Sequence, residues 1–252
     1  MGSCVHLVRR YHEDDRQHER RRRLLRAWFS SYVQTYLERD VRLVSAVRDL
    51  PTFRRFLALV ATRTGQMLNR TDLAAPLGVS VPTISAWLSV LEVTGQIALV
   101  PPFFESFGKR ITKSPKIYLL DSGLACHLLG IESERELARS PFLEGFVASE
   151  IIKQQVHAGR RREIYHFRDR QGLEVDFVVP GKAGALFLVE AKASRTVRPT
   201  MADAVVRLSR AIRGRRVRGL VVHRGGMAGT DATALRPGVK ALPLADALDA
   251  LR

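Results

Sequence analysis

The sequence predicts a mixed α/β chain (α+β overall) in which a helical, winged helix-turn-helix part precedes an α/β domain with a central mixed sheet. Three observations predict this organisation. The chain has 252 residues, enough for two modest domains. Capped short helices and one hairpin fill residues 55–130, and from Ser140 a helix, three strands, a helix and a strand follow in order. We expect a basic tail and helical segment over 1–54, the winged helix over 55–130, and the α/β domain over 140–252.

A basic tail and an amphipathic helix open the chain. Residues 1–24 are polar and end in four consecutive arginines, and aromatic residues then recur at spacings of three and four from Trp28 to Tyr36. This periodicity predicts a helix over Leu24–Asp49. Asp49-Leu50-Pro51 is expected to break it, because the residue before a proline disfavours helical backbone. Apolar residues from Phe53 to Val60 predict a second helix that ends near Gly65.

The middle of the chain has the order of elements of a winged helix-turn-helix. Asn69 is placed to cap a short helix that Gly78 ends, and Ser80 is placed to cap the next one. Strands are expected over Gln96–Pro101 and Lys116–Leu120, with a basic loop between them. Two helices joined by a tight turn and followed by a hairpin indicate this motif.

The second helix of this motif supports two interpretations. In the first it enters the major groove of DNA and the loop binds phosphates, through a set of polar and basic residues: Thr83, Ser85, Ala86 and Ser89 on the helix, and Lys109, Arg110 and Lys113 in the loop. In the second it is a spacer between proteins, because its exposed face carries no Arg, Lys, Asn or Gln.

The stretch Leu173–Ser194 predicts a hairpin that carries charged side chains at one end of a sheet. Its first strand alternates apolar and acidic residues and contains Asp176, and its second contains Glu190 and Lys192 on one face. Two carboxylates suit Mg²⁺, or Mn²⁺ in its place, and an ammonium beside them would position a water or neutralise charge on phosphate. The alternative is that these side chains are merely solvated strand ends.

A third acid is expected from the helix that begins near Ser140 and ends near His157. On a helical wheel Glu144 lies near the middle of the apolar arc, whereas Glu150 lies at its edge. A carboxylate on a buried stripe is unfavourable unless it binds something, so Glu144 is the better third metal ligand. The alternative is an acidic residue that stabilises the helix N-terminus.

Charge and composition favour a polyanionic partner. Lysine and arginine number 41 against 25 acidic residues, a formal charge of +16, so nucleic acid ranks first, although an arginine-rich composition also arises in GC-rich genomes. The two cysteines show no disulfide or zinc spacing, and no apolar run is long enough to cross a bilayer. We therefore expect a cytoplasmic protein without a membrane partner. It has no ATP site of its own, because no P-loop sequence occurs.

Several segments together resemble a known family. Aspartate followed by Glu-x-Lys on two apolar strands resembles the PD-(D/E)xK nuclease signature, and the order of elements resembles a restriction-endonuclease-like core. The further matching segments are Trp28-x-x-x-Tyr32-x-x-x-Tyr36-x-x-Arg39-Asp40-Val41, Lys113-Ser114-Pro115-Lys116-Ile117-Tyr118-Leu119-Leu120-Asp121-Ser122-Gly123-Leu124, Glu144-x-x-Val147-x-x-Glu150, Glu174-Val175-Asp176-Phe177 and Val189-Glu190-Ala191-Lys192. These segments, from about Trp28 to Arg224, resemble the C-terminal half of prokaryotic AAA-type ATPases, called domain of unknown function 4143.

This resemblance implies a P-loop ATPase, a winged helix and a PD-(D/E)xK nuclease-like domain in that order, but this sequence lacks the ATPase. The first hypothesis is a DNA-binding, Mg²⁺-dependent nuclease in which Glu144, Asp176 and Glu190 bind the ion and Lys192 orients water. The second is a non-catalytic module that binds DNA or protein and works with an ATPase. Its partner would then be a separate P-loop chain that docks on the aromatic helix Trp28–Tyr36. Alternatively, it would associate with copies of itself as a homo-oligomer.

Overall fold

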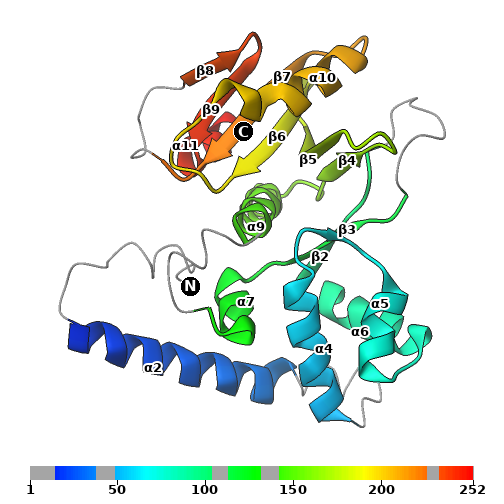
Figure 1. The fold of residues 1–252 in the computed structure, drawn as a ribbon, viewed down its shortest axis with the longest axis vertical. Coiled ribbons are helices and arrows are strands. Elements are labelled where there is room, and N and C mark those ends of the chain that lie inside the picture. Colours follow the sequence, from blue (N-terminus) through cyan, green and yellow to red (C-terminus); the bar gives the residue numbers. More distant parts are fainter. Residues whose placement is uncertain (1–14, 38–48, 104–112, 132–141, 226–232, 252) are drawn as a thin grey trace. The chain divides into compact units, whose positions relative to one another are not determined.

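The computed structural model of the chain describes residues 15–37, 49–103, 113–131, 142–225 and 233–251 (Figure 1). The chain forms two compact units whose segments alternate along the sequence. The first unit comprises Met1–Ala98 and Ile117–Leu137, and the second comprises Leu99–Lys116 and Ala138–Arg252. The predicted α/β class with a mixed sheet is confirmed, because the larger sheet combines parallel and antiparallel pairs.

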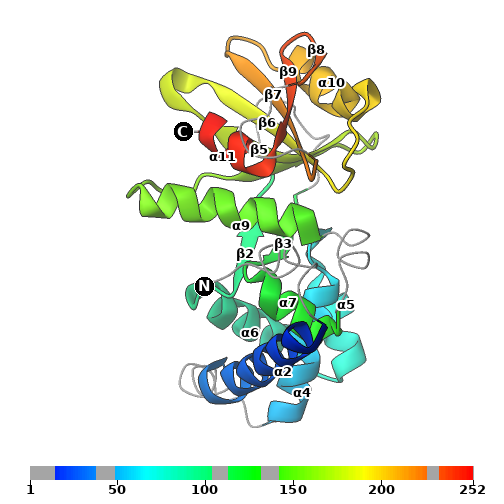
Figure 2. The ribbon, with the colours of Figure 1, turned by 90° about the vertical axis from the view of Figure 1, so that its left-hand side faces the viewer.

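A long helix opens the described part of the first unit. α2 (Asp15–Tyr32) continues into a π-helical turn, η1 (Val33–Leu37), so the helix begins nine residues before the predicted Leu24. α2 packs against α7 (Ser122–Leu129), as Figure 2 shows. In this contact the Phe29 ring stacks on the His127 ring, with the ring centroids 5.7 Å apart. Residues 38–48, the second half of the predicted helix, lie outside the described residues.

The second predicted helix is present and begins at the expected break, three residues before the predicted start at Phe53. α4 (Leu50–Thr62) has Pro51 in its first turn, and Asp49 caps it by accepting a hydrogen bond from the Thr52 backbone N–H at 3.1 Å. Proline is tolerated there because the first helical N–H groups have no partner within the helix. The prediction that Asp49–Pro51 ends a helix missed that the same residues start one.

The next elements along the chain, of which β2 and β3 cross the boundary between the units, follow the order of a winged helix. They are β1 (Gln66–Met67), α5 (Arg70–Ala74), η2 (Ala75–Leu77), α6 (Val81–Val93), β2 (Ile97–Val100) and β3 (Lys116–Leu119). The strands form one sheet in the order β1-β3-β2. Asn69 and Ser80 cap α5 and α6 as predicted, since they accept from Thr71 N at 3.1 Å and Thr83 N at 3.2 Å. The two helical segments meet at 110°, within the range of helix-turn-helix motifs.

The second unit is built on a six-stranded sheet in the order β4-β5-β6-β7-β9-β8. Its helices and strands are α9 (Phe142–His157), β4 (Tyr165–Arg168), β5 (Glu174–Pro180), η4 (Lys182–Gly184), β6 (Leu186–Lys192), η5 (Pro199–Ala202), α10 (Asp203–Ala211), β7 (Val217–His223), β8 (Thr233–Arg236), β9 (Val239–Pro243) and α11 (Leu244–Ala250). β4, β5 and β6 pair antiparallel, whereas β6, β7 and β9 pair parallel.

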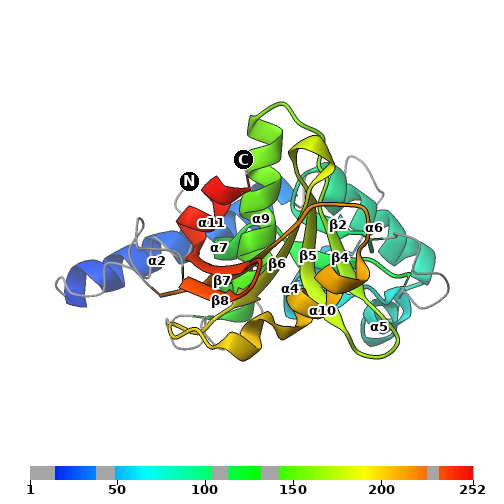
Figure 3. The same ribbon diagram turned by 90° about the horizontal axis from the view of Figure 1, so that it is seen from above.

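Helices cover both faces of this sheet. Figure 3 shows α9 and α11 on one side and α10 on the other. On the α10 side, Val205 and Leu208 pack with Leu186, Leu188 and Val221 in one buried cluster. The hairpin of β5 and β6 forms as predicted, and Val175–Val179 is buried at every position, so both faces of this strand are covered.

The structure bears on the predictions about the cysteines and about membrane-spanning helices. Cys126 is buried and belongs to no disulfide among the described residues, and Cys4 lies outside the described residues. Of the helices that the structure describes, none alone is long and apolar enough to cross a membrane. One bent pair, Arg70–Leu77 with Val81–Val93, reaches that length and composition only when its two helices are counted together.

We predict that Leu208→Ala lowers the free energy of unfolding of the second unit by about 2–5 kcal/mol, because it leaves a cavity between α10 and the sheet. Leu208 is 0% exposed. The matched control Arg207→Ala, at an exposed position on the same helix, should change stability by less than about 0.5 kcal/mol. Urea unfolding measures both values, and equal losses would contradict the packing described.

Candidate functional site

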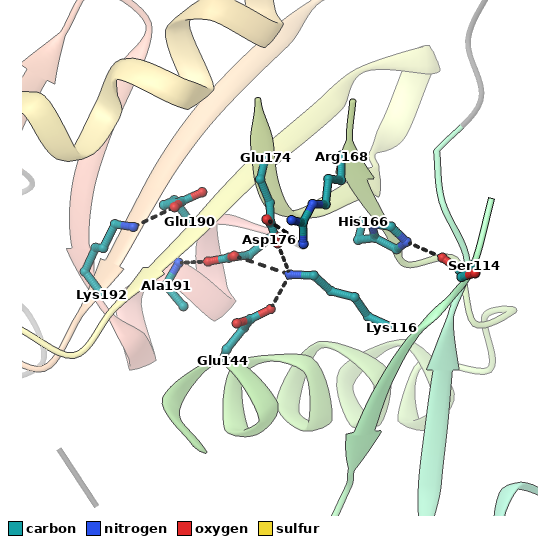
Figure 4. A network of polar contacts seen from close by, with 10 residues as sticks. All are labelled: Ser114, Lys116, Glu144, His166, Arg168, Glu174, Asp176, Glu190, Ala191 and Lys192. Carbon is teal, nitrogen blue, oxygen red and sulfur yellow. Dashed lines mark hydrogen bonds and ion pairs between the residues drawn. The ribbon is translucent and has the colours of Figure 1, made fainter. Parts of the chain in front are cut away.

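Two acidic side chains from adjacent strands form the centre of the candidate site (Figure 4). Phe177 of β5 pairs with Val189 of β6, so the neighbouring Asp176 and Glu190 come together across the hairpin. Asp176 Oδ2 accepts a hydrogen bond from the Ala191 backbone N–H at 2.9 Å. Both carboxyl groups are buried, which disfavours their charged forms. The site is therefore an inward-facing acid pair and not a solvated strand end.

Lys116 joins this pair to two further acids. Its Nζ lies 2.9 Å from Glu144 Oε1 of α9, 2.7 Å from Glu174 Oε1 of β5, and 3.8 Å from Asp176 Oδ1. Figure 4 shows the ammonium at the centre of these carboxylates. The Lys116 side chain is only 2% exposed. Carboxylates from α9 and β5 thus surround the ammonium nitrogen of the first residue of β3.

The electrostatics of Lys116 explain why a lysine is tolerated at a buried position. Burial by itself lowers the pKa of an ammonium, but the negative charges of Glu144, Asp176 and Glu174 outweigh it and raise the pKa of Lys116. Burial likewise opposes the charged form of Glu174, yet the hydrogen bond and charge of Lys116 keep the pKa of Glu174 below its usual value. Lys116 is therefore a permanent cation at neutral pH.

Glu190 and Lys192 form the second half of the site. Lys192 Nζ lies 2.6 Å from Glu190 Oε1, as the spacing of two along one strand allows. Glu190 Oε2 is buried and has no hydrogen-bond partner among the described residues. Burial raises the pKa of Glu190 although Lys192 opposes the shift, and burial together with Glu144 and Glu190 raises the pKa of Asp176 well above its usual value. Burial therefore disfavours the charged forms of Asp176 and Glu190 even with the two lysines beside them.

His166 of β4 closes the site on the side of Lys116. Its Nε2 lies 3.1 Å from the Ser114 carbonyl oxygen, while its Nδ1 is buried without a partner in the described structure. Burial is the main cause that lowers the pKa of His166, to about 4, and the positive charges of Lys116 and Arg168 act in the same direction. Arg168 also lies 3.5 Å from Glu174 Oε2. His166 is therefore neutral at physiological pH.

The sequence prediction named four members of this site and missed three. Glu144, Asp176, Glu190 and Lys192 lie together, and Glu150 instead pairs with Lys153 on α9 at 2.9 Å. Sequence reasoning did not place Lys116, Glu174 or His166 in the site. A signal for Lys116 was present, because this charged residue opens an otherwise apolar strand within one of the matching segments.

The residues predicted to contact DNA are described only in part. Ser85 and Ser89 on α6 donate their hydroxyl protons to the carbonyl oxygens of Val81 and Ser85 at 3.0 and 2.9 Å. Thr83 Oγ1 lies 2.8 Å from the Ser80 hydroxyl. Lys113 is exposed, and Lys109 and Arg110 lie outside the described residues. The polar groups of this helix face are therefore engaged within the helix, where they are less available for reading bases.

The donor set was compared with the needs of a divalent cation. No group of three or more His, Cys, Asp or Glu side chains in the described ranges is arranged to hold a metal ion, and Glu144 Oε1 already accepts from Lys116. Two features nevertheless fit Mg²⁺ or Mn²⁺: Asp176 and Glu190 supply hard oxygens, of which Glu190 Oε2 has no partner, and the Lys116 ammonium shows that the acids accommodate a positive charge. The oxygens of Asp176 and Glu190 are therefore of the type that such an ion prefers, whereas Glu144 Oε1 is engaged by Lys116.

The fold and the site thus define an α/β unit with a buried acid and lysine cluster. Residues 139–245, which contain all of this cluster except Lys116 and Ser114, match the family model of a domain of unknown function, DUF4143. The predicted resemblance to domain of unknown function 4143 is confirmed for this region. Residues 11–135 match a different domain of unknown function, DUF8612.

Two curated mycobacterial proteins are similar to the chain. They are the uncharacterized protein Rv2008c of Mycobacterium tuberculosis and the uncharacterized protein Mb2031c of Mycobacterium bovis, each 34% identical over 157 residues. The matched region is 61% of this chain and 35% of either relative, so the chain spans about a third of their length. No solved structure matches the chain.

We predict that His166 makes stability depend on pH between its unfolded and folded pKa values. The unfolded chain takes up a proton near pH 6.5, whereas the folded protein does so only at about 4, so stability falls as the pH drops through this window. Between pH 7 and pH 5 the loss due to His166 should be about 1–2 kcal/mol. Glu174, Arg168 and Lys116 face the ring and also contribute, so a variant comparison is needed.

The comparison uses His166→Gln, whose amide retains a donor for the Ser114 carbonyl oxygen. Urea unfolding at pH 7 and pH 5 should show a smaller loss on acidification for this variant than for the wild type. The carboxylates contribute equally to the pH dependence of stability in both proteins, so their contribution cancels when the two are compared. An identical pH dependence in the two proteins would show that His166 is not held neutral.

Proposed function

We propose that the second unit hydrolyses phosphodiester bonds in nucleic acid with the help of Mg²⁺ or Mn²⁺. One observation carries this proposal: Asp176, Glu190 and Lys192 from one hairpin and Glu144 from a distant helix gather in a single buried network. Carboxylates beside ammonium groups combine the ligands of a hard cation with positive charge for a phosphate. The resemblance to PD-(D/E)xK nucleases supports the same reaction.

Each residue then has a distinct role. Asp176 and Glu190 would hold the ion, and Glu144 would join them once released from Lys116. The bound cation would supply a coordinated water of lowered pKa and neutralise charge on the phosphate. Lys192, held 2.6 Å from Glu190, would stabilise the negative phosphate oxygens. A water oxygen bonds to phosphorus, the phosphorus–oxygen bond to the leaving nucleotide breaks, and the water proton ends on the leaving oxygen.

A basic groove on the α10 side of the second unit supports nucleic-acid binding, although it lies on the face of the sheet opposite to α9 and Glu144. Arg207, Arg210 and Arg236 line a groove of about 580 Å³ beside α10, together with Ser209. Among the described residues that line this groove, Arg236 forms an ion pair with Asp203 at 3.4 Å. Arg207 and Arg210 are exposed. With a formal charge of +16 for the whole chain, such a groove suits a phosphate backbone.

A non-catalytic binding module is the second candidate, and Lys116 favours it. The ammonium already occupies the place of a cation between Glu144 and Asp176, so the cluster is stable without a metal ion. Such a module would bind nucleic acid in a salt-sensitive manner and leave it intact. The resemblance to ATPase C-terminal halves suggests that a separate P-loop chain would govern it.

The aromatic helix is the surface proposed for docking on that ATPase. Trp28 is 46% exposed and stacks on Tyr32 with ring centroids 5.3 Å apart. Phe29 and Val33, by contrast, are buried within the first unit, and Tyr32 accepts a hydrogen bond from Gln96 at 2.9 Å. Half of the predicted stripe therefore serves the unit itself, which reduces the surface left for a partner.

Cleavage is tested by incubating the chain with linear, nicked and branched DNA in Mg²⁺ and in Mn²⁺. Asp176→Asn and Glu144→Gln should each lower the cleavage rate by at least about 100-fold, because they remove charge from the ion site. Glu150→Gln is the matched control on α9 and should cleave like the wild type. Circular dichroism checks that each variant is folded. Absence of cleavage by the wild type in either metal would leave the binding module as the function.

Binding is tested separately by measuring DNA affinity against salt concentration. The double variant Arg207→Ala and Arg210→Ala should bind more weakly and should reduce the slope of log K against log salt by about 2, one for each lost phosphate contact. Arg160→Ala with Arg161→Ala, at exposed positions after α9, serves as the control for net charge. Equal slopes for the two double variants would show that the groove does not bind the backbone.

A further inference from the structure

Lys116 occupies a position that the proposed reaction assigns to a metal ion. Its Nζ contacts oxygens of Glu144 and Asp176, two of the three acids expected to hold Mg²⁺. A surface lysine would leave these oxygens accessible, but this side chain is 2% exposed and is held by a third acid, Glu174, at 2.7 Å. The acids therefore have a cation built into the chain.

We infer that Lys116 is an internal competitor of the divalent cation, so that metal binds only by displacing this ammonium from Glu144 and Asp176. This inference rests on the proposed function, because it concerns the same acids, but it makes a separate statement about them. It assigns Lys116 a regulatory and positioning role, whereas Lys192 remains beside Glu190. The site then has two states: one closed by the ammonium and one holding the ion.

Charge repulsion and the use of a shared oxygen both oppose simultaneous binding of Lys116 and the ion at Glu144 and Asp176. An ion bound to Asp176 and Glu144 would lie a few ångströms from Nζ, where two positive charges repel strongly in a buried site. The same Glu144 oxygen cannot complete the shell of the ion while it accepts from Lys116 at 2.9 Å. Displacement is feasible for the side chain, because lysine has four rotatable bonds and a strongly hydrated head group.

The orphan oxygen of Glu190 indicates where the ion first binds. Glu190 Oε2 has no partner in the described structure, and Lys116 contacts neither of the Glu190 oxygens. An incoming cation can therefore contact Glu190 first, before it displaces the lysine from Asp176 and Glu144. Glu144 and Glu174 are released last, when their shared cation moves away.

The experiment measures binding of Mn²⁺ alone to the whole chain, by the loss of the free-ion electron paramagnetic resonance signal. Lys116→Met should bind Mn²⁺ about tenfold more tightly than the wild type, or better, because a positive charge next to the ion is gone. Lys116→Gln should do the same with a polar side chain of similar reach. Lys153→Met is the matched control, since Lys153 also lies 2.9 Å from a glutamate, Glu150, and its affinity should be unchanged.

Thermal unfolding provides a second test if the lysine variants are less stable than the wild type. At a given Mn²⁺ concentration, the melting temperature of these variants should rise by more than that of the wild type. Adding Asp176→Asn to Lys116→Met should abolish both effects. Affinity in both lysine variants equal to or below that of the wild type, with no larger melting shift, would overturn the inference even if the wild type cleaves DNA. Tight binding in the variants with no cleavage by any protein would support the inference and overturn the nuclease proposal.

Discussion

The arrangement of the second unit depends on one buried ammonium. Taking several carboxylates out of water is strongly unfavourable, and such a cluster persists only where opposite charge enters with it. Lys116 supplies that charge to Glu144, Glu174 and Asp176 at once. It thereby fixes the N-terminal turns of α9 against the acidic end of β5, and every role proposed for the site presupposes this balance.

Local patterns predicted the frame of the molecule well. The turn residues and apolar runs around Leu173–Ser194 defined the hairpin, and the caps Asn69 and Ser80 defined two helix starts, because both features depend on neighbours in sequence. Helical periodicity also separated Glu144 from Glu150. These predictions succeed because hydrogen bonds between near neighbours decide them.

Other features depend on contacts distant in sequence and could not be obtained that way. Lys116 reaches Glu144 across 28 positions, and a lysine is normally assigned to the surface. β8 carries mostly exposed residues and lacks an apolar signature, and β5 is covered on both faces because helices pack on each side of the sheet. The sequence predicts that Pro51 breaks a helix. In the structure Pro51 lies in the first turn of α4, because Asp49 caps the N-terminus of that helix.

The interleaving of the two units has a practical consequence for dissecting the protein. The region matched by DUF4143 begins at residue 139, whereas the second unit also takes Leu99–Lys116 from the middle of the chain. A fragment cut at the family boundary would contain the carboxylates and leave their lysine behind. Truncated forms of this region should therefore include Lys116 and should not begin at the boundary of the sequence match. Without Lys116, the buried carboxylates would lose their counterion, and the fragment would not represent the intact chain.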